Sequence, residues 1–161
     1  RADYFGSNWP SLDDLFDLMI QILTGIQSTA SALTAERTRL DVIAENIAHA
    51  QTTRGPDGRP YQRRVVVFET VLQGALGRGA SSGPTAEVRV ARVQTDPRPP
   101  LLVYRPGHPD ADANGMVAMP NINVHEEMAD LIAASRAYEA NLAVVKTARA
   151  MAMQTLAIGK R

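Results

Sequence analysis

Proline and glycine are concentrated in the middle of this 161-residue chain. Nine of the ten prolines lie between Pro56 and Pro120, and eight of the eleven glycines lie between Gly55 and Gly115. The two flanks, residues 26–54 and 121–158, contain neither residue. Because proline and glycine end helices, the flanks are free to form long helices and the middle is not. The sequence therefore predicts an α+β fold, with a long helix at each end and a small β region between them.

Apolar residues in the N-terminal flank follow a seven-residue repeat. One position of the repeat holds Ile26, Leu33, Leu40 and Ile47, and a second holds Leu23, Ala30, Arg37 and Ala44. Val42 and Ile43 widen this stripe. Alternating spacings of three and four residues place such side chains along one side of a helix. We predict a helix from about Thr24 to Gln51.

The C-terminal flank repeats the pattern. Its two repeat positions hold Met128, Ser135, Leu142, Arg149 and Leu156, and Leu131, Tyr138, Val145 and Ala152. Asn123 is the expected N-cap, with Glu126 closing a capping box, and Gly159 is the expected C-cap. Two such helices pair either with each other, as a hairpin within the chain, or with helices of other copies in a coiled-coil core. The pattern alone leaves both arrangements open.

The middle of the chain has the composition of short β-strands. Residues 61–72, 86–94 and 101–104 are rich in β-branched and apolar side chains, and we expect them to form one small three-stranded sheet. The alternation of the second strand slips near Ala91, which predicts a β-bulge. Residues 74–84 hold four glycines and two serines, which predicts a mobile loop.

The first 18 residues differ from the rest. They hold half of the chain's eight aromatic side chains and one arginine against four aspartates. We interpret them as an N-terminal extension and divide the chain into residues 1–18, 19–54, 55–120 and 121–161. No basic region precedes an apolar stretch at the N-terminus, so we expect no cleaved secretory signal. No apolar run approaches the ~18–20 residues of a membrane span, so we expect no direct membrane insertion.

Groups for catalysis or metal binding are sparse. The chain has no cysteine, and its three histidines occur in no metal-binding motif. His125, Glu126 and Glu127 are consecutive on a helix and point in different directions, which favours roles at the helix N-terminus. The formal net charge is zero, which gives no reason to expect nucleic acid as a partner. We predict no enzyme activity and no cofactor; the loop around His108 is where a catalytic group would lie if there were one.

Three ordered segments resemble a known family. Residues 40–50 (LDVIAENIAHA), 118–128 (AMPNINVHEEM) and 135–141 (SRAYEAN) resemble segments of the rod and hook proteins of the bacterial flagellum. The loops at residues 52–61 and 104–115 are similar to those of one rod member of that family. His49, Gln51 and Arg59 depart from the usual pattern. The resemblance spans residues 19–160.

The resemblance implies a structural subunit that polymerises through its terminal helices into the rod. It implies export through the flagellar type III apparatus without a cleaved signal, a periplasmic location, and a helical inner core. Expected partners are further copies of the chain, other rod proteins of the FlgB, FlgF, FlgG and FliE type, and the export apparatus. The short central region, about 65 residues, favours the proximal rod. A helical-hairpin adaptor that binds one partner through the same stripes is the alternative.

The resemblance also favours packing between subunits over a hairpin closed within the chain. We therefore expect the apolar stripes, with Asn46 and Asn141 beside them, to form the subunit interface. The predicted interface residues are Ile26, Leu33, Leu40, Asn46, Ile47, Met128, Leu131, Tyr138, Asn141, Leu142 and Val145.

Overall fold

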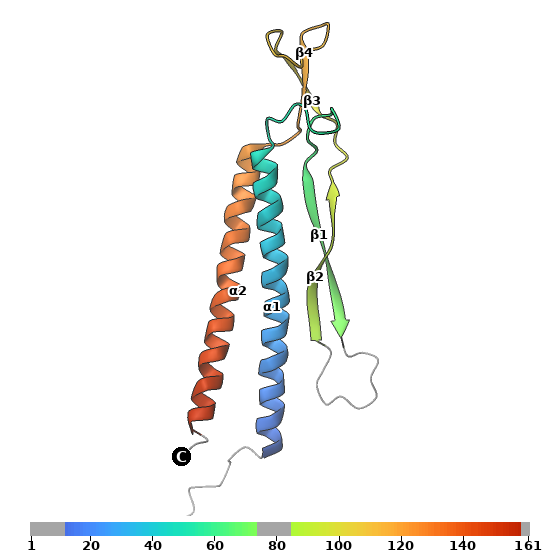
Figure 1. Ribbon diagram of the computed structural model, residues 1–161. Coiled ribbons are helices and arrows are strands. Elements are labelled where there is room, and N and C mark those ends of the chain that lie inside the picture. The colour runs from blue at the N-terminus through green and yellow to red at the C-terminus, as the bar shows by residue number, and fades with distance from the viewer. Residues whose placement is uncertain (1–11, 74–84, 159–161) are drawn as a thin grey trace, which may run out of the picture.

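The computed structural model describes residues 12–73 and 85–158 (Figure 1). Two long helices and four strands follow one another in the order α1 (Leu12–Ala48), β1 (Arg64–Gln73), β2 (Thr85–Thr95), β3 (Leu101–Tyr104), β4 (Met116–Met119) and α2 (Val124–Ile158). The α+β class is confirmed. The predicted mobile loop at residues 74–84, the first eleven residues and the expected C-cap Gly159 lie outside the described residues.

Helix α1 is longer than predicted. It begins at Leu12 rather than near Thr24 and ends at Ala48, three residues before Gln51. Gly25 lies within it, because a glycine costs a helix only about 1 kcal/mol relative to alanine, too little to end so long an element. With 37 and 35 residues, α1 and α2 are about 55 and 52 Å long. The helix runs without interruption through the expected boundary between residues 18 and 19.

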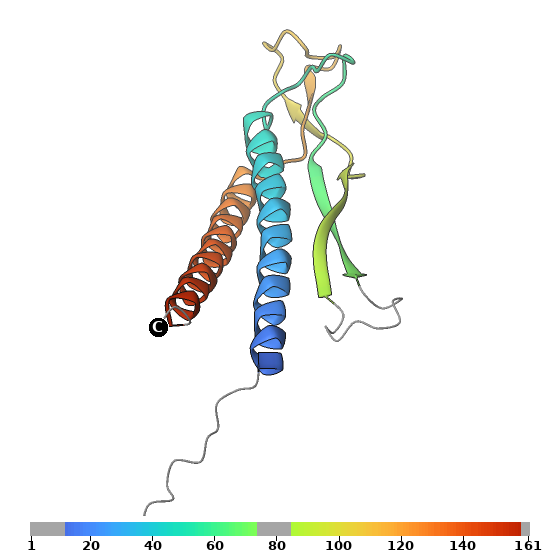
Figure 2. The same ribbon diagram turned by 60° about the horizontal axis from the view of Figure 1, so that its bottom comes forward.

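The two helices pack side by side in opposite directions (Figures 1 and 2). Among the described elements α2 packs only on α1, so burial along α2 marks the side turned toward α1. Ala134 is fully buried there, and one predicted repeat position is half-buried: Leu131, Tyr138, Val145 and Ala152. The second buried position is Glu127, Ala134, Asn141 and Ala148, one residue before the predicted one. Ala134 and Ala148 at this position are small, which lets the helix backbones approach closely.

The β region is two separate hairpins rather than one sheet. β1 pairs with β2 and β3 pairs with β4, both antiparallel. The expectation of three strands in one sheet was wrong: β4 was not predicted, and residues 96–100, Asp-Pro-Arg-Pro-Pro, separate the hairpins. Proline has no N–H to donate to a β-ladder, so pairing stops at this segment. The β3–β4 hairpin lies beyond the end of the helix pair (Figure 1).

The predicted bulge at Ala91 is confirmed, and it controls how the first hairpin meets α1. Val67 pairs with Arg92 and Phe68 pairs with Val90, which leaves Ala91 unpaired. A bulge increases the local twist of a strand pair. The twisted strands cross along the hairpin, so β1 lies next to α1 near the C-terminal end of the helix and β2 lies next to it farther back (Figure 1).

Polar side chains of α1 cover the strand edge that faces them. The Ser28 hydroxyl donates to the carbonyl of Ala86 at 2.8 Å, and Ser31 Oγ accepts from the amide of Val88 at 3.3 Å. Beside them, Gln27 Nε2 donates to the buried carboxylate of Glu87 at 2.7 Å. Open strand edges are sites of unwanted pairing, and the helix satisfies this one with hydroxyl groups.

The apolar core is small for a chain of this length. The buried apolar residues among those described are Ala35, Val42, Ile43, Val117 and Ala134. Large apolar side chains remain exposed on α2 and on both hairpins: Val124, Met128, Ile132, Val144, Met151 and Met153 on α2, and Phe68, Leu72, Val93, Leu101, Leu102 and Tyr104 on the strands. No helix of the described part of the chain has the length and apolar character to cross a membrane.

Gly115 is predicted to be required for the β3–β4 hairpin. Its φ is +74°, and a Cβ atom there would lie 3.0 Å from Tyr104 Cε2 and 3.1 Å from Pro106 Cβ. Gly115→Ala should cost about 1–2 kcal/mol for the left-handed backbone alone, with steric strain added. The measurement is hydrogen exchange at the Arg105 amide, which donates to the Gly115 carbonyl at 2.8 Å.

Two controls separate the causes. Gly58 has a similar φ of +70°, but a Cβ atom there would face open space, so Gly58→Ala tests the backbone angle alone. Gly107 has no positive φ and also has open space around its Cβ position, so Gly107→Ala tests neither effect. Exchange at Arg105 should rise in Gly115→Ala and stay unchanged in the other two variants. Equal protection in Gly115→Ala and wild type would contradict the prediction.

Candidate assembly site and its polar support

The side chain of Asn46 joins α1 to the start of β1. Its Nδ2 donates to the Arg64 carbonyl at 2.9 Å, and its Oδ1 accepts from the Arg64 amide at the same distance. The amide group therefore takes the place of a paired strand residue beside β1. Oδ1 also accepts from the Tyr61 hydroxyl at 3.1 Å, and Nδ2 donates to Glu127 Oε2 at 3.1 Å. Both donors and both acceptor positions of this buried amide are satisfied.

Glu127 brings α2 into the same cluster. Its side chain is 1% exposed, and its two oxygens have different partners. Oε2 accepts from Asn46, and Oε1 accepts from Arg63 Nε at 2.6 Å. Because a buried carboxylate is costly without a partner, the ion pair with Arg63 and the hydrogen bond from Asn46 are both needed. The sequence assigned Glu127 only a role at the helix N-terminus; the structure places it at the junction of α1, α2 and β1.

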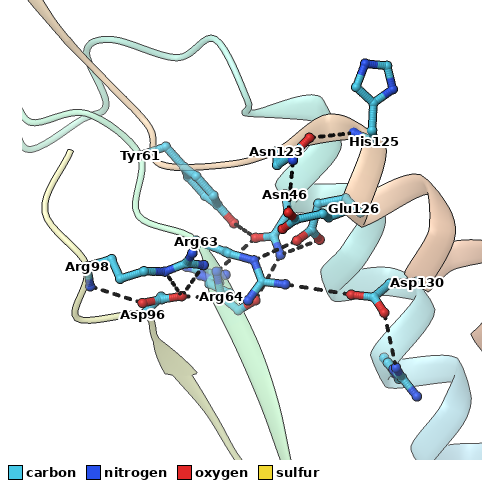
Figure 3. A network of polar contacts seen from close by, with 12 residues as sticks. Asn46, Tyr61, Arg63, Arg64, Asp96, Arg98, Asn123, His125, Glu126 and Asp130 are labelled. Atoms are coloured by element: carbon cyan, nitrogen blue, oxygen red, sulfur yellow. Dashed lines mark hydrogen bonds and ion pairs between the residues drawn. The ribbon is translucent and has the colours of Figure 1, made fainter. Parts of the chain in front are cut away.

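Ion pairs extend the cluster on both sides (Figure 3). Arg63 lies 3.7 Å from Asp96 and 3.8 Å from Asp130, and Asp130 lies 3.7 Å from Arg39 of α1. Asp96 in turn accepts from the backbone amide and the guanidinium of Arg98. We name the network around Asn46, Arg63, Arg64, Glu127 and Tyr61 the polar hub. It connects the two terminal helices with the segments that begin and follow the first hairpin.

Tyr61 and His49 close the hub at the end of α1. Their rings are stacked with centroids 4.8 Å apart. Burial raises the pKa of Tyr61, and the carboxylates of Glu45 and Glu127 raise it further, whereas Arg64 opposes them. The phenol therefore remains protonated at neutral pH and donates its hydrogen bond to Asn46.

The loop around His108 contacts the loop after α1. The Thr53 hydroxyl donates to Asp110 Oδ2 at 2.8 Å, and Arg54 lies 3.7 Å from Asp110 Oδ1. His108 Nδ1 accepts from the Asp110 amide at 3.1 Å. In this way the loop holds the β3–β4 hairpin against the end of α1. No group of three or more potential metal ligands occurs in the part of the chain that the structure describes.

Asn123 caps α2, although the capping box differs from the expected form. Asn123 Oδ1 accepts from the His125 amide at 3.1 Å. Glu126 accepts from the side-chain amide of Asn123 at 3.0 Å rather than from its backbone amide. The cap fixes the first turn of α2, which carries Glu127 into the hub.

The predicted interface residues occupy three kinds of position. Asn46 is buried in the hub, so its side chain is used within the subunit and offers no surface to a neighbour. Met128 is 52% exposed. The others are half-buried along the helices: Ile26, Leu33, Leu40, Ile47, Leu131, Tyr138, Asn141, Leu142 and Val145. We therefore leave Asn46 out of the interface proposed below. Sequence patterns did not indicate that Tyr61, Arg63, Asp96 and Glu127 come together, because they bind groups that are distant in the sequence.

Comparison with known proteins identifies the family. The flagella basal body rod protein family matches residues 26–55, and the C-terminal family of flagellar basal body rod FlgEFG proteins matches residues 113–158. The flagellar basal-body rod protein FlgC of Yersinia enterocolitica is 41% identical over 88% of this chain and all of its own length. The FlgC proteins of Borreliella burgdorferi and Salmonella typhimurium are 40% and 45% identical over 85% and 81% of the chain, and 97% and 92% of their own lengths.

The chain belongs to the FlgC family of flagellar basal-body rod proteins.

This membership confirms the resemblance to rod proteins. A FlgC-family chain is a structural rod subunit of the flagellar basal body and not an enzyme. The two matched segments contain the helical half of the hub, with Asn46 in the first and Glu127 in the second. The hub is therefore the structural support that sets the two rod-type helices of this FlgC-family protein against each other.

Asn46→Asp is predicted to destabilise the protein strongly. The new carboxylate has no donor for the Arg64 carbonyl and faces the carboxylate of Glu127 at hydrogen-bond distance. We expect a loss of roughly 3–5 kcal/mol in the free energy of unfolding, the range for breaking a buried charged network. Urea denaturation followed by circular dichroism measures it.

Asn141→Asp is the matched control. Asn141 is a half-buried asparagine on α2 away from the hub, and the same change there should cost under about 1 kcal/mol. Adding Glu127→Gln to Asn46→Asp should restore part of the loss, because it removes the like charge. Equal losses at positions 46 and 141 would show that the hub is not a source of stability.

Asp96 is predicted to make stability depend on pH in the acid range. Hydrogen bonds from Arg98 hold the pKa of Asp96 below its usual value, and the charge of Arg63 adds to this. As pH falls, the unfolded chain therefore takes up this proton first. The stabilisation is present above the usual aspartate pKa of about 4 and is lost as pH falls toward the lower folded value.

Asp96→Asn tests this in urea titrations between pH 7 and pH 3. The difference in unfolding free energy between wild type and variant should shrink as pH falls below about 4. Asp57→Asn, at an exposed aspartate in the loop after α1, gives the background for removing a carboxylate. A wild-type advantage as large at pH 3 as at pH 7 would contradict the prediction.

Proposed function

We propose that the chain polymerises through its two terminal helices into the proximal part of the flagellar rod. The observation that carries the proposal is the excess of exposed over buried large apolar side chains on α2. Met128, Ile132, Val144, Met151 and Met153 are each more than half exposed in the single subunit. Burial of such side chains contributes roughly 25 cal/mol per Å² of apolar area, which favours association with other helices.

The proposed assembly is a helical inner core with the β region outside it. Among the described elements the first hairpin packs only on α1, which leaves most of α2 available to neighbouring subunits. The proposed neighbours are further copies of the chain and other rod proteins, of the FlgB, FlgF, FlgG and FliE type. The helices of several subunits would pack in coiled-coil fashion, with Leu40, Leu131, Leu142 and Val145 among the residues at or beside the contacts.

The proximal position is proposed from the size of the central region. Two short hairpins are the only strand-forming elements between the helices in the described part of the chain. Such a subunit gives a thin wall, which suits the narrow segment nearest the membrane. We further propose delivery to the periplasm through the flagellar export apparatus without a cleaved signal, on the resemblance to rod proteins.

The location of the protein tests the proposal. An epitope-labelled chain should be found by electron microscopy in the membrane-proximal segment of isolated basal bodies. Label in the distal rod or hook, and none in the proximal segment, would overturn the assignment. A labelled chain found only as a soluble complex with one partner would favour the adaptor alternative.

Leu142→Pro is predicted to abolish motility. Proline at this position removes a backbone hydrogen bond of α2 and clashes with the preceding turn, at a cost of about 3 kcal/mol or more. Swimming in soft agar and counts of basal bodies with rods measure the effect in a strain that carries only the variant. Leu142→Ala, which keeps the helix, should retain more motility. A motile Leu142→Pro strain would show that an unbroken α2 is not required.

A further inference from the structure

A groove opens between α1 and α2 toward the end of the helix pair that lies away from the hub. Its volume is about 240 Å³, and no lining residue carries a charge. The lining includes Gly25, Ile26 and Thr29 of α1 and Val144, Ala148 and Met151 of α2. Val144 and Met151 are 55% and 54% exposed, so the groove is open to a neighbour. An apolar group is the occupant that this lining fits.

Gly25 has no explanation within the subunit. It lies inside α1, its φ is not positive, and a Cβ atom added there would meet nothing within 4 Å. Glycine weakens a helix interior relative to alanine, so the residue lowers the stability of the isolated subunit. A glycine whose Cβ position faces open space in one subunit suits a close approach from outside.

The complementary feature lies on the other flank of α2. Met128 and Ile132 are one helical turn apart and are 52% and 54% exposed. Leu131 and Val145 lie on the side of α2 that faces α1. Ile132 comes one residue after Leu131, whereas Val144 comes one residue before Val145. Ile132 and Val144 therefore lie on opposite flanks of that side. The exposed pair and the groove are also near opposite ends of α2.

We propose that the groove at Gly25 receives the side chains of Met128 and Ile132 from a second copy of the chain. The inference rests on the proposed function and names the contact that would carry part of it. The flexible methionine side chain adapts to irregular apolar spaces. Because the two surfaces differ and lie on opposite flanks, the contact is head-to-tail and repeats from copy to copy. Such contacts build open helical filaments rather than closed dimers.

Cysteine cross-linking of the full chain tests the contact, since the chain has no cysteine of its own. Ile132→Cys and Ala148→Cys proteins are mixed at high concentration, oxidised and separated on a non-reducing gel. The mixed dimer should exceed either homodimer several-fold, and the double variant should form a ladder of multimers. Ala150→Cys, at an exposed position on the Ile132 flank of α2 and outside the groove, replaces Ala148→Cys as the control and should give no excess. No excess for the 132–148 pair over this control would overturn the proposal.

Gly25→Leu gives an independent test with two readouts of opposite sign. The monomer should become more stable, with a melting temperature raised by roughly 2–4 °C, because leucine favours a helix and its Cβ atom would meet open space. The multimer ladder should be lost, because the side chain fills the groove. Ala150→Leu, outside the groove, should keep the ladder. A ladder that survives Gly25→Leu would overturn the proposal.

Cross-linking in isolated basal bodies separates this inference from the proposed function. A subunit present in the rod without the 132–148 bond, or with Ile132→Cys bonded to a different rod protein, overturns the groove contact and leaves the proposed function standing. A subunit absent from the rod contradicts the proposed function, even where the bond forms in solution.

Discussion

The arrangement of the whole subunit depends on one amide side chain. Asn46 uses both its donors and both its acceptor positions to hold the backbone of Arg64, the hydroxyl of Tyr61 and the carboxylate of Glu127. A hydrophobic side chain of similar size would leave these buried groups without partners, which is more costly than losing the hydrogen bonds themselves. With few buried apolar side chains, the subunit relies on this polar junction to set the helices and the first hairpin against one another.

The division between core and surface on α2 follows from side-chain size. Where α2 faces α1, small residues such as Ala134 and Ala148 alternate with larger ones, and the backbones approach closely. The large side chains of Met128 and Ile132 project from the flank instead. In a single subunit these large apolar side chains of α2 therefore remain exposed to solvent.

Local signals in the sequence were sufficient for some elements and not for others. The seven-residue repeat and the absence of proline and glycine predicted both helices, and the slip in alternation predicted the bulge at Ala91. The seven-residue repeat did not show which of two adjacent repeat positions faces α1, the one with Met128 and Leu142 or the one with Ala134 and Asn141. Periodicity alone does not record how closely two helices approach. The early start of α1 was missed because Gly25 was given too much weight as a helix end.

The hub was the least predictable feature, since its members are distant in the sequence. Asn46 was predicted to lie in the subunit interface, but its partner is a backbone group 18 residues away in the same chain. Glu127 precedes Leu131 by four residues and Ala134 by seven, a spacing that indicates burial. Its proximity to the helix N-terminus nevertheless offered a simpler explanation. The membership of the FlgC family adds the context in which exposed apolar flanks are expected.

The hydrogen bond between Asn46 and Glu127 spans 81 positions of the chain, and this separation sets an order of events. A chain delivered N-terminus first, from a ribosome or through a narrow channel, has α1 and the first hairpin available long before residue 127 emerges. Until then Asn46 and Arg63 lack their carboxylate, and α1 has no second helix to pack on. Long-range contacts of this kind also form slowly, because the loop between them must first be closed. The subunit therefore cannot complete its fold until nearly four-fifths of the chain has emerged.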